Sequence, residues 1–257
     1  ITMNQTEEDF LIYDDDDEAI AAWFKNNKTK AQLIPFSLTK TFEKGAFIKN
    51  KKMEVNIINE EEFTMETETM ALEGQHNMKN AMAATSVAKL MKIRNATIRE
   101  SLSNFQGVEH RLEKVLKIQN VQYINDSKAT NPHAASAALL SHLSNIWIAG
   151  GLAKGAKMDE LISRSKSRIK AAILIGKDAE IIAKALEKFA PEIPVHKILD
   201  NSNPADLMDE VVECALKLSS AGDTVLLAPA CASMDQFSSY AQRGDLFIDS
   251  VTRLVTK

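Results

Sequence analysis

The sequence is poor in cysteine, has no long apolar run and carries no excess of positive charge. Its two cysteines, Cys214 and Cys231, lack C-x-x-C or metal-ligand spacing, which favours a reduced, cytoplasmic setting. No apolar stretch approaches the ~18 residues of a membrane span, and no signal peptide is visible. The formal net charge of -4 gives no indication of binding to nucleic acid or a membrane surface. We therefore expect small-molecule partners and a monomer.

Two phosphate-binding motifs are also absent from the sequence. No G-x-x-x-x-G-K-[ST] loop occurs, and IGKDAE lacks both the first glycine and the hydroxyl residue after the lysine. No G-x-G-x-x-G follows a predicted strand, which argues against a Rossmann-like dehydrogenase domain. The chain begins ITMNQ rather than at an initiator methionine, so we expect a piece of a longer protein.

The length and composition are typical of about two globular domains. The chain has 257 residues, of which 45% are hydrophobic and 26% are charged. The first hundred residues read as strand-rich, and the acidic run at 14–18 reads as a solvated turn that begins a helix rather than as a metal site. Expected strands are 10–13, 31–38, 45–50, 53–58 and part of 63–72, with 45–58 as a hairpin, and expected helices are 17–26, 74–93 and 97–105.

From about residue 107 onward, predicted strands and helices alternate. This pattern is typical of a doubly wound, mostly parallel α/β sheet of Rossmann type. We therefore place two domains, at 1–107 and 108–257. Strands are expected at 112–118, 121–126, 145–150, 171–176, 193–199 and 224–230, and helices at 132–142, from 157, at 178–189, at 204–219 and from 241.

The segment INDSKATNPHA, residues 124–134, joins a predicted strand to a predicted helix. Asn131 is placed to cap that helix and Pro132 to occupy its first turn. A lysine near a helix N-terminus, at the carboxyl end of a strand, is typical of an anion-binding site. The same residues could instead serve only as turn and capping residues, with Lys128 exposed to solvent. Three further loops follow strands in this way, AGGLAKG, IGKD and APACASMDQF, and together they suggest a site for a small carboxylated or phosphorylated molecule.

Taken in order, GQHNMKNAMAA, EHRLE, INDSKATNP, AGGLAKG and LLAPACASMDQFSSYAQRGDLF resemble the Mur ligase family of peptidoglycan synthesis, and most closely its D-glutamate-adding branch. The resemblance covers most of residues 70–250. It implies the later part of the family's central ATPase domain, followed by a Rossmann-like C-terminal domain that binds the amino acid.

The resemblance also implies a reaction and its cofactors. ATP and Mg²⁺ would activate the carboxylate of UDP-N-acetylmuramoyl-L-alanine as an acyl phosphate, which the amine of D-glutamate then attacks. The phosphate loop, the magnesium ligands, the modified lysine and the uridine-nucleotide domain of the family would precede residue 1. We therefore expect no metal site in this chain and no ligation by the chain alone.

Four nucleotide-binding residues follow from the resemblance. It places Asn77 and Asn80 at the adenine, Arg111 near the phosphates or ribose, and Asp126 at the ribose hydroxyls, where an acceptor-only carboxylate fits. Without it, Asn77 would read as a helix cap and Asn80 as a surface residue. His110, beside Arg111, suits either the motif or a packing role at the domain hinge.

For D-glutamate, the resemblance assigns Lys128, Thr130, Lys154 and Ser233 to the carboxylates, with both lysines as catalytic residues. Tyr240 stands where the family commonly has phenylalanine, so a backbone contact would survive there while the hydroxyl changes the local polarity. Many relatives carry an acidic residue before the lysine of AGGLAKG, where this chain has Ala153, which leaves open what orients that lysine.

Two alternatives stay open. One is a sibling ligase, adding another amino acid or acting on a folate, against which the DSKATN and ACASMDQF segments argue. The other is a stand-alone module that binds a nucleotide or an amino acid without catalysis, which the missing phosphate loop motivates.

Overall fold

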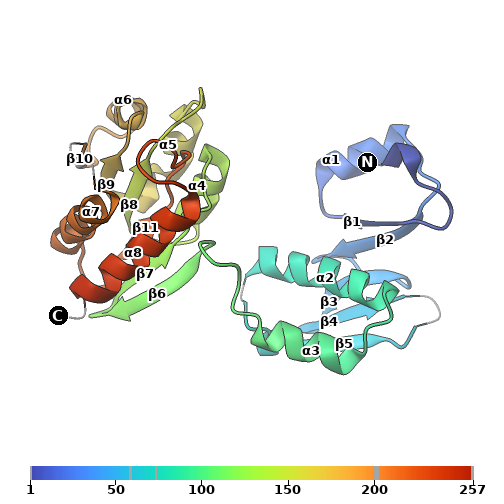
Figure 1. Ribbon diagram of the computed structural model, residues 1–257. Helices are drawn as coiled ribbons and strands as arrows, with labels where there is room; N and C mark the ends of the chain where they lie inside the picture. Colours follow the sequence, from blue (N-terminus) through green and yellow to red (C-terminus); the bar gives the residue numbers. More distant parts are fainter. Residues whose placement is uncertain (1, 58–59, 73, 200–202, 256–257) are drawn as a thin grey trace. The chain divides into compact units, whose positions relative to one another are not determined.

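The computed structural model describes residues 2–57, 60–72, 74–199 and 203–255. The chain divides into two compact units, Ile1–Gly107 and Val108–Lys257 (Figure 1). Each unit has its own sheet and its own hydrophobic core.

The first unit contains a five-stranded sheet in the order β1-β2-β3-β4-β5. β1, β2 and β3 run parallel, and β3, β4 and β5 pair antiparallel. Asn50 and Lys51 have φ angles of 51° and 63°, the left-handed conformation that tight hairpin turns require, which confirms the predicted hairpin. The strands are Phe10–Asp14, Gln32–Ser37, Gly45–Lys49, Lys52–Asn56 and Phe63–Glu66.

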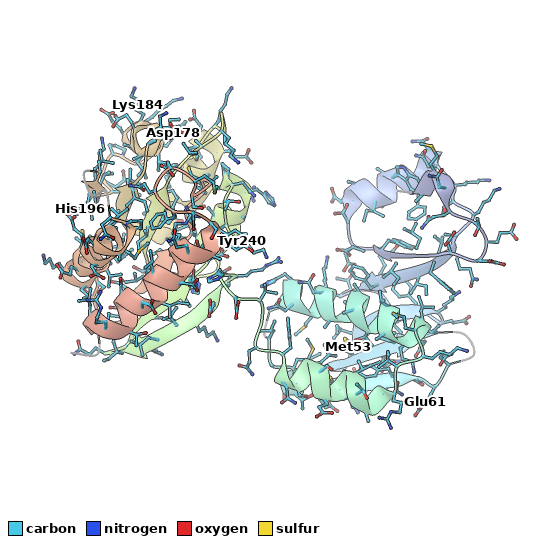
Figure 2. All side chains as sticks on the ribbon, viewed as in Figure 1. Met53, Glu61, Asp178, Lys184, His196 and Tyr240 are labelled. Atoms are coloured by element: carbon cyan, nitrogen blue, oxygen red, sulfur yellow. The ribbon has the colours of Figure 1, made fainter. Side chains whose placement is uncertain are left out.

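Helices pack against this sheet around a core that includes Met53, Phe63 and Met82, all fully buried. Figure 2 labels Met53 in this unit. α2 contacts β1, β2, β3 and β4, so its buried side holds the unit together. The helices are α1 (Glu18–Asn26), α2 (Gln75–Leu90) and α3 (Asn95–Asn104), with short 3-10 turns η1 (Thr2–Asn4) and η2 (Thr67–Thr69).

The acidic run before α1 is only partly a solvated turn. Asp17 caps α1 as expected, since its carboxylate accepts the N–H groups of the second and third helical residues. Asp14 and Asp16 differ: Asp14 pairs with Lys79 of α2 at 2.7 Å, and Asp16 accepts the Leu38 N–H at 2.7 Å. The prediction of solvation is wrong for these two, because they tie β1 to α2 and to the end of β2.

The second unit contains a six-stranded sheet in the order β10-β9-β8-β11-β7-β6. Every neighbouring pair is parallel except β6 with β7, which confirms a mostly parallel sheet. All six residues of the inner strand β8 are buried, as expected of a strand covered on both faces. The strands are β6 (Glu113–Ile118), β7 (Val121–Asn125), β8 (Asn145–Gly150), β9 (Ile169–Ile175), β10 (Val195–Ile198) and β11 (Thr224–Leu227).

Two separate clusters of buried side chains line the two faces of this sheet. Trp147 belongs to one, with α4, α5 and α6, while Ile146 and Ile148 belong to the other, with α7 and α8. The sheet is therefore doubly wound, as predicted (Figure 1). The helices are α4 (Pro132–Leu140), α5 (Asp159–Ser165), α6 (Ala179–Phe189), α7 (Pro204–Leu218) and α8 (Tyr240–Val255), with a 3-10 turn η3 (Lys166–Arg168).

Candidate functional site

The four loops identified in the sequence follow β7, β8, β9 and β11. These strands are neighbours in the sheet, in the order β9-β8-β11-β7, and all run parallel. Their carboxyl ends therefore meet at one edge, where open α/β sheets bind ligands. We call these four loops the carboxyl-edge loops.

The carboxyl-edge loops are joined through their backbones. Leu152 and Ala232 exchange two N–H···O hydrogen bonds of 2.8 and 3.0 Å, which link the loops after β8 and β11. The Ala230 N–H donates to the Ala129 carbonyl at 2.9 Å, which links the loops after β11 and β7. Three of the loops thus form one connected surface.

Two glycines allow this close approach. Gly150 and Gly151 both have φ near +122°, which side chains rarely adopt. A Cβ on Gly150 would lie 1.8 Å from the Ile175 carbonyl oxygen, and one on Gly151 would lie 2.1 Å from the Ala232 oxygen. The glycine pair of AGGLAKG therefore lets β8 end against two neighbouring backbones.

The loop after β7 has the capping arrangement expected from its sequence. Asn131 accepts the Ala134 N–H at 3.0 Å, and Pro132 begins α4. Within the loop, Lys128 is exposed and its Nζ lies 5.4 Å from the centroid of the Tyr240 ring, a cation–π distance. Thr130 is half-buried on the same segment.

Lys154, in the loop after β8, is exposed and has a φ of 51°. The N–H of the preceding Ala153 donates to Asp178 Oδ2 at 2.8 Å, and the Asp178 N–H donates to the Gly151 carbonyl at 3.0 Å. Asp178, from the loop after β9, thus braces the lysine's loop. The sequence alone did not give Asp178 this role.

Ser233 and Tyr240 lie after β11. Ser233 is buried, and its carbonyl accepts the Phe237 N–H at 2.9 Å. Tyr240 is the first residue of α8, and its carbonyl accepts the Ser127 hydroxyl at 2.7 Å (Figure 2). Its side chain is partly exposed, and Lys128 lies over its ring.

Asp126 is a buried carboxylate at the end of β7. Its Oδ1 accepts the Leu112 N–H at 3.3 Å. Burial raises the pKa of Asp126 to about 6, although the Leu112 N–H and the positive charge of Arg111 oppose this shift. Arg111 is exposed. At neutral pH the pair offers an acceptor-only carboxylate and a nearby exposed cation.

His110 is packed inside the second unit. It is buried, has a φ of 60°, and its Nδ1 lies 3.0 Å from the Asn125 side-chain nitrogen. Its carbonyl accepts the Lys128 N–H at 3.1 Å. A Cβ on Gly244 would lie 2.3 Å from its ring nitrogen, so the glycine of AQRGDLF leaves space for the imidazole.

Asn77 and Asn80 lie in the first two turns of α2, in the first unit. Asn77 is half-buried and Asn80 is exposed. The N-cap residue of α2 is Gly74, so the interpretation of Asn77 as a cap is wrong. Between the two amides, Lys79 forms the ion pair with Asp14 that ties α2 to β1.

Arg243 is a residue of this edge that sequence reasoning missed. It is fully buried, and its guanidinium donates to Ser127 and to the Cys231 carbonyl. Helical periodicity could have indicated its burial. Arg243 lies on the same face of α8 as Phe247, Ser250 and Val251, which pack inward.

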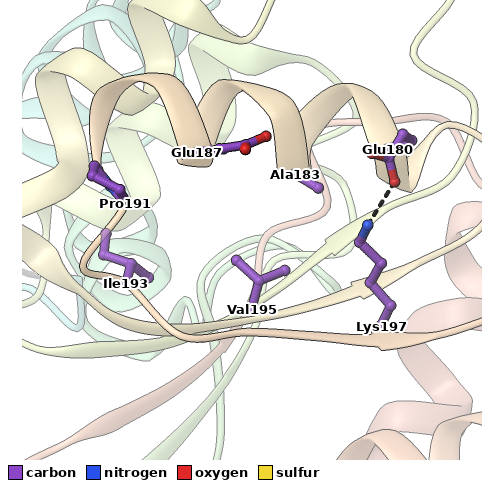
Figure 3. Close-up of a pocket in the computed structure, with 8 residues that line it drawn as sticks. Glu180, Ala183, Glu187, Pro191, Ile193, Val195 and Lys197 are labelled. Atoms are coloured by element: carbon purple, nitrogen blue, oxygen red, sulfur yellow. Dashed lines mark hydrogen bonds and ion pairs between the residues drawn. The ribbon is translucent and has the colours of Figure 1, made fainter.

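No metal site or membrane helix accompanies these loops in the part of the chain that the structure describes. No group of three His, Cys, Asp or Glu side chains there could hold a metal ion. No helix among the described residues is long and apolar enough to cross a bilayer. A groove of about 510 Å³ lies between α6 and β10, flanked by the Glu180–Lys197 ion pair, but none of the predicted site residues lines it (Figure 3).

Comparison with known proteins gives two family matches. Residues 1–88 match the Mur ligase middle domain, and residues 110–231 match the Mur ligase glutamate ligase domain. The UDP-N-acetylmuramoylalanine--D-glutamate ligase of Christiangramia forsetii is 49% identical over 255 residues, 99% of this chain and 55% of the relative. The enzyme of the same name from Porphyromonas gingivalis is 41% identical over 257 residues, 99% of this chain and 55% of the relative.

The chain spans about half the length of the curated relatives it matches. Solved structures share the fold at low identity. A murein peptide ligase from Psychrobacter arcticus aligns with a TM-score of 0.61 and 15% identity, over 96% of this chain and 50% of that one. A bifunctional folylpolyglutamate synthase/dihydrofolate synthase from Yersinia pestis aligns with a TM-score of 0.53 and 14% identity, over 92% of this chain and 50% of that one.

Proposed function

Because this chain belongs to the Mur ligase family, we propose that it is part of an ATP-dependent ligase that adds D-glutamate to UDP-N-acetylmuramoyl-L-alanine in peptidoglycan synthesis. Relatives that align with nearly the whole chain bear that ligase's name. The observation that carries the proposal is the connected carboxyl-edge surface, which places the loops of Lys128, Lys154 and Ser233 at one edge of the sheet.

In this proposal, the second unit binds D-glutamate. Lys128 and Lys154 neutralise its carboxylates as point charges, while the hydroxyls of Thr130 and Ser233 give hydrogen bonds with direction. Tyr240 contributes through its backbone to the Ser127 hydroxyl and through its ring to the placement of Lys128. Held in this way, the amine of D-glutamate is oriented for attack, which is where positioning contributes most to such a reaction.

The nucleotide residues fit ATP in their chemistry. Asp126 is buried and acceptor-only, with a carboxylate oxygen available to a ribose hydroxyl. Arg111 is exposed and free to move toward phosphate, and Asn77 and Asn80 offer both donors and acceptors to adenine. ATP, when bound, supplies the phosphoryl group that activates the carboxylate as an acyl phosphate.

We propose that the magnesium ligands lie mainly outside these 257 residues, because the chain spans about half the length of the relatives that bear this ligase's name. The chain alone is then a monomeric, cytoplasmic binding unit without ligase activity. Substrate-dependent ADP formation by the purified chain would overturn that expectation.

The D-glutamate assignment is tested by titrating the ¹⁵N-labelled chain with D-glutamate and following amide shifts of residues 127–130, 153–155 and 232–234. We expect Lys128→Met and Lys154→Met each to weaken binding by about tenfold, because each removes a charged partner of a carboxylate. Lys177→Met is the matched control, since Lys177 is an exposed lysine of the neighbouring loop with no assigned role. Equal effects of all three variants, or tighter binding of another amino acid, would refute the assignment.

A further inference from the structure

Arg243 is the one arginine of the described chain that is fully buried. It lies on α8, one turn after Tyr240, on the side of the helix that faces the core. Its position connects it to two of the carboxyl-edge loops at once.

The guanidinium donates to both of these loops, and its Nη2 is shared between them, since it also donates to the Cys231 carbonyl at 3.4 Å. Nε donates to the Ser127 hydroxyl at 3.0 Å, and Nη2 donates to the Ser127 carbonyl at 2.9 Å. Nη1 donates to the Cys231 carbonyl at 3.3 Å. The Ser127 hydroxyl in turn donates to the Tyr240 carbonyl at 2.7 Å, so the start of α8 joins the same network.

All of these acceptors are neutral. No carboxylate of the described residues forms an ion pair with Arg243, although burial lowers its pKa only to about 10, so it remains charged at neutral pH. The negative charge of Asp235 favours the charged guanidinium, but only beyond ion-pair distance. Burying a cation without a direct ion pair is costly, and replacing such a group by an apolar side chain of similar size is often neutral or stabilising. Packing alone therefore does not account for an arginine at this position.

The two anchors lie next to the proposed binding groups. Ser127 immediately precedes Lys128, and Cys231 stands two residues before Ser233. A guanidinium group is planar and rigid, so the acceptors that it bonds are held at a fixed separation. Arg243 thus holds the segments of Lys128 and Ser233 together from their buried side, in addition to the Ala230–Ala129 backbone hydrogen bond.

We propose that Arg243 is a positioning residue that fixes the separation of the Lys128 and Ser233 loops and thereby sets the length of the dicarboxylic amino acid that the edge accepts. This inference rests on the proposed function. It adds a determinant of substrate length that does not itself touch the substrate.

The test compares D-glutamate with D-aspartate, which is one methylene shorter, by titrating the ¹⁵N-labelled chain. In Arg243→Met, we expect the Kd for D-glutamate to rise by about tenfold, roughly 1.4 kcal/mol, and the preference over D-aspartate to shrink, because the two carboxylate-binding segments would lose a link that fixes their separation. Arg243→Lys should not restore the preference, since one ammonium cannot span both anchors. Arg253→Met is the matched control: this exposed arginine of α8 pairs with Asp209, and its loss should leave both Kd values unchanged.

Amide hydrogen exchange gives a readout independent of the ligand. Arg243→Met and the milder Ser127→Ala should speed exchange at residues 128–130 and 231–233 and leave the strands of the sheet protected. A folded Arg243→Met chain with wild-type selectivity and wild-type exchange would overturn the inference. Failure of the wild-type chain to bind D-glutamate would instead refute the proposed function and the selectivity role, while exchange would still decide whether Arg243 holds the loops.

Discussion

At the scale of single residues, the carboxyl edge combines exposed charges that are free to bind with buried ones that hold the loops. Lys128, Lys154 and Arg111 are exposed, whereas Asp126 and Arg243 are buried among backbone groups. Exposed cations adapt to a ligand, and buried groups keep a fixed geometry because moving them would break hydrogen bonds in a low-dielectric setting.

Asp126 leads to a prediction about pH. Burial raises its pKa from 3.8 to about 6, so between these pH values the folded state holds a proton that the unfolded state has lost. The contribution of this group to the free energy of unfolding therefore falls as the pH rises through that window, by on the order of 3 kcal/mol.

Asp126→Asn removes this ionisation. We expect the variant to gain stability relative to the wild type from pH 4 to pH 6, measured by urea unfolding at intervals across the window. It should also bind ATP more weakly, because the amide is a poorer acceptor for a ribose hydroxyl. Parallel stability curves for the two proteins would show that Asp126 is ionised in the folded state throughout.

At the scale of elements, the alternation of strands and helices predicted the second sheet well, and β8 matches the expected 145–150. Long-range side-chain partners were less predictable. Asp14 and Asp16 meet Lys79 more than sixty residues along the chain, and Arg243 meets Ser127 across 116 residues. From sequence alone, charged residues next to turns or within an amphipathic helix are predicted to be exposed to solvent, because most charged residues are. Partners that are distant in sequence become apparent only in the folded structure.

The end of β8 gives an element-scale prediction. Gly150→Ala would place a Cβ 1.8 Å from the Ile175 carbonyl oxygen, so β8 and β9 could not keep their spacing. We expect a loss of more than ~3 kcal/mol in the free energy of unfolding, measured by urea denaturation followed by circular dichroism.

Gly155→Ala is the control for this substitution. Gly155 also has a positive φ but has open space around its Cβ position, so only about 1 kcal/mol of backbone strain is expected. If both variants lost the same stability, the close approach at Gly150 would not be what requires glycine there.

At the scale of the whole molecule, the two units have separate sheets and separate cores. The second unit buries both faces of its sheet with its own helices, and all the proposed D-glutamate residues belong to it. The sequence indicated this division through the change to regular strand–helix alternation near residue 107. The bracing by Asp178 and Arg243 could not be read in this way, because it depends on loops that come together only in the fold.

Residues 108–257 expressed alone should therefore fold, unfold in one cooperative transition and retain the D-glutamate response of the full chain. Calorimetry and the same amide titration test this. A disordered product, or a folded one that ignores D-glutamate while the full chain responds, would show that the first unit is required.

The backbone hydrogen bonds between Leu152 and Ala232, and between Ala129 and Ala230, also bear on redesign. A loop transplanted singly from a ligase with another amino-acid preference would meet amides and carbonyls shaped for its former neighbours. Engineering a new preference on this scaffold therefore calls for exchanging the loops after β7, β8 and β11 as one block. Natural divergence of the edge would have to follow the same rule, with substitutions in these three segments changing together.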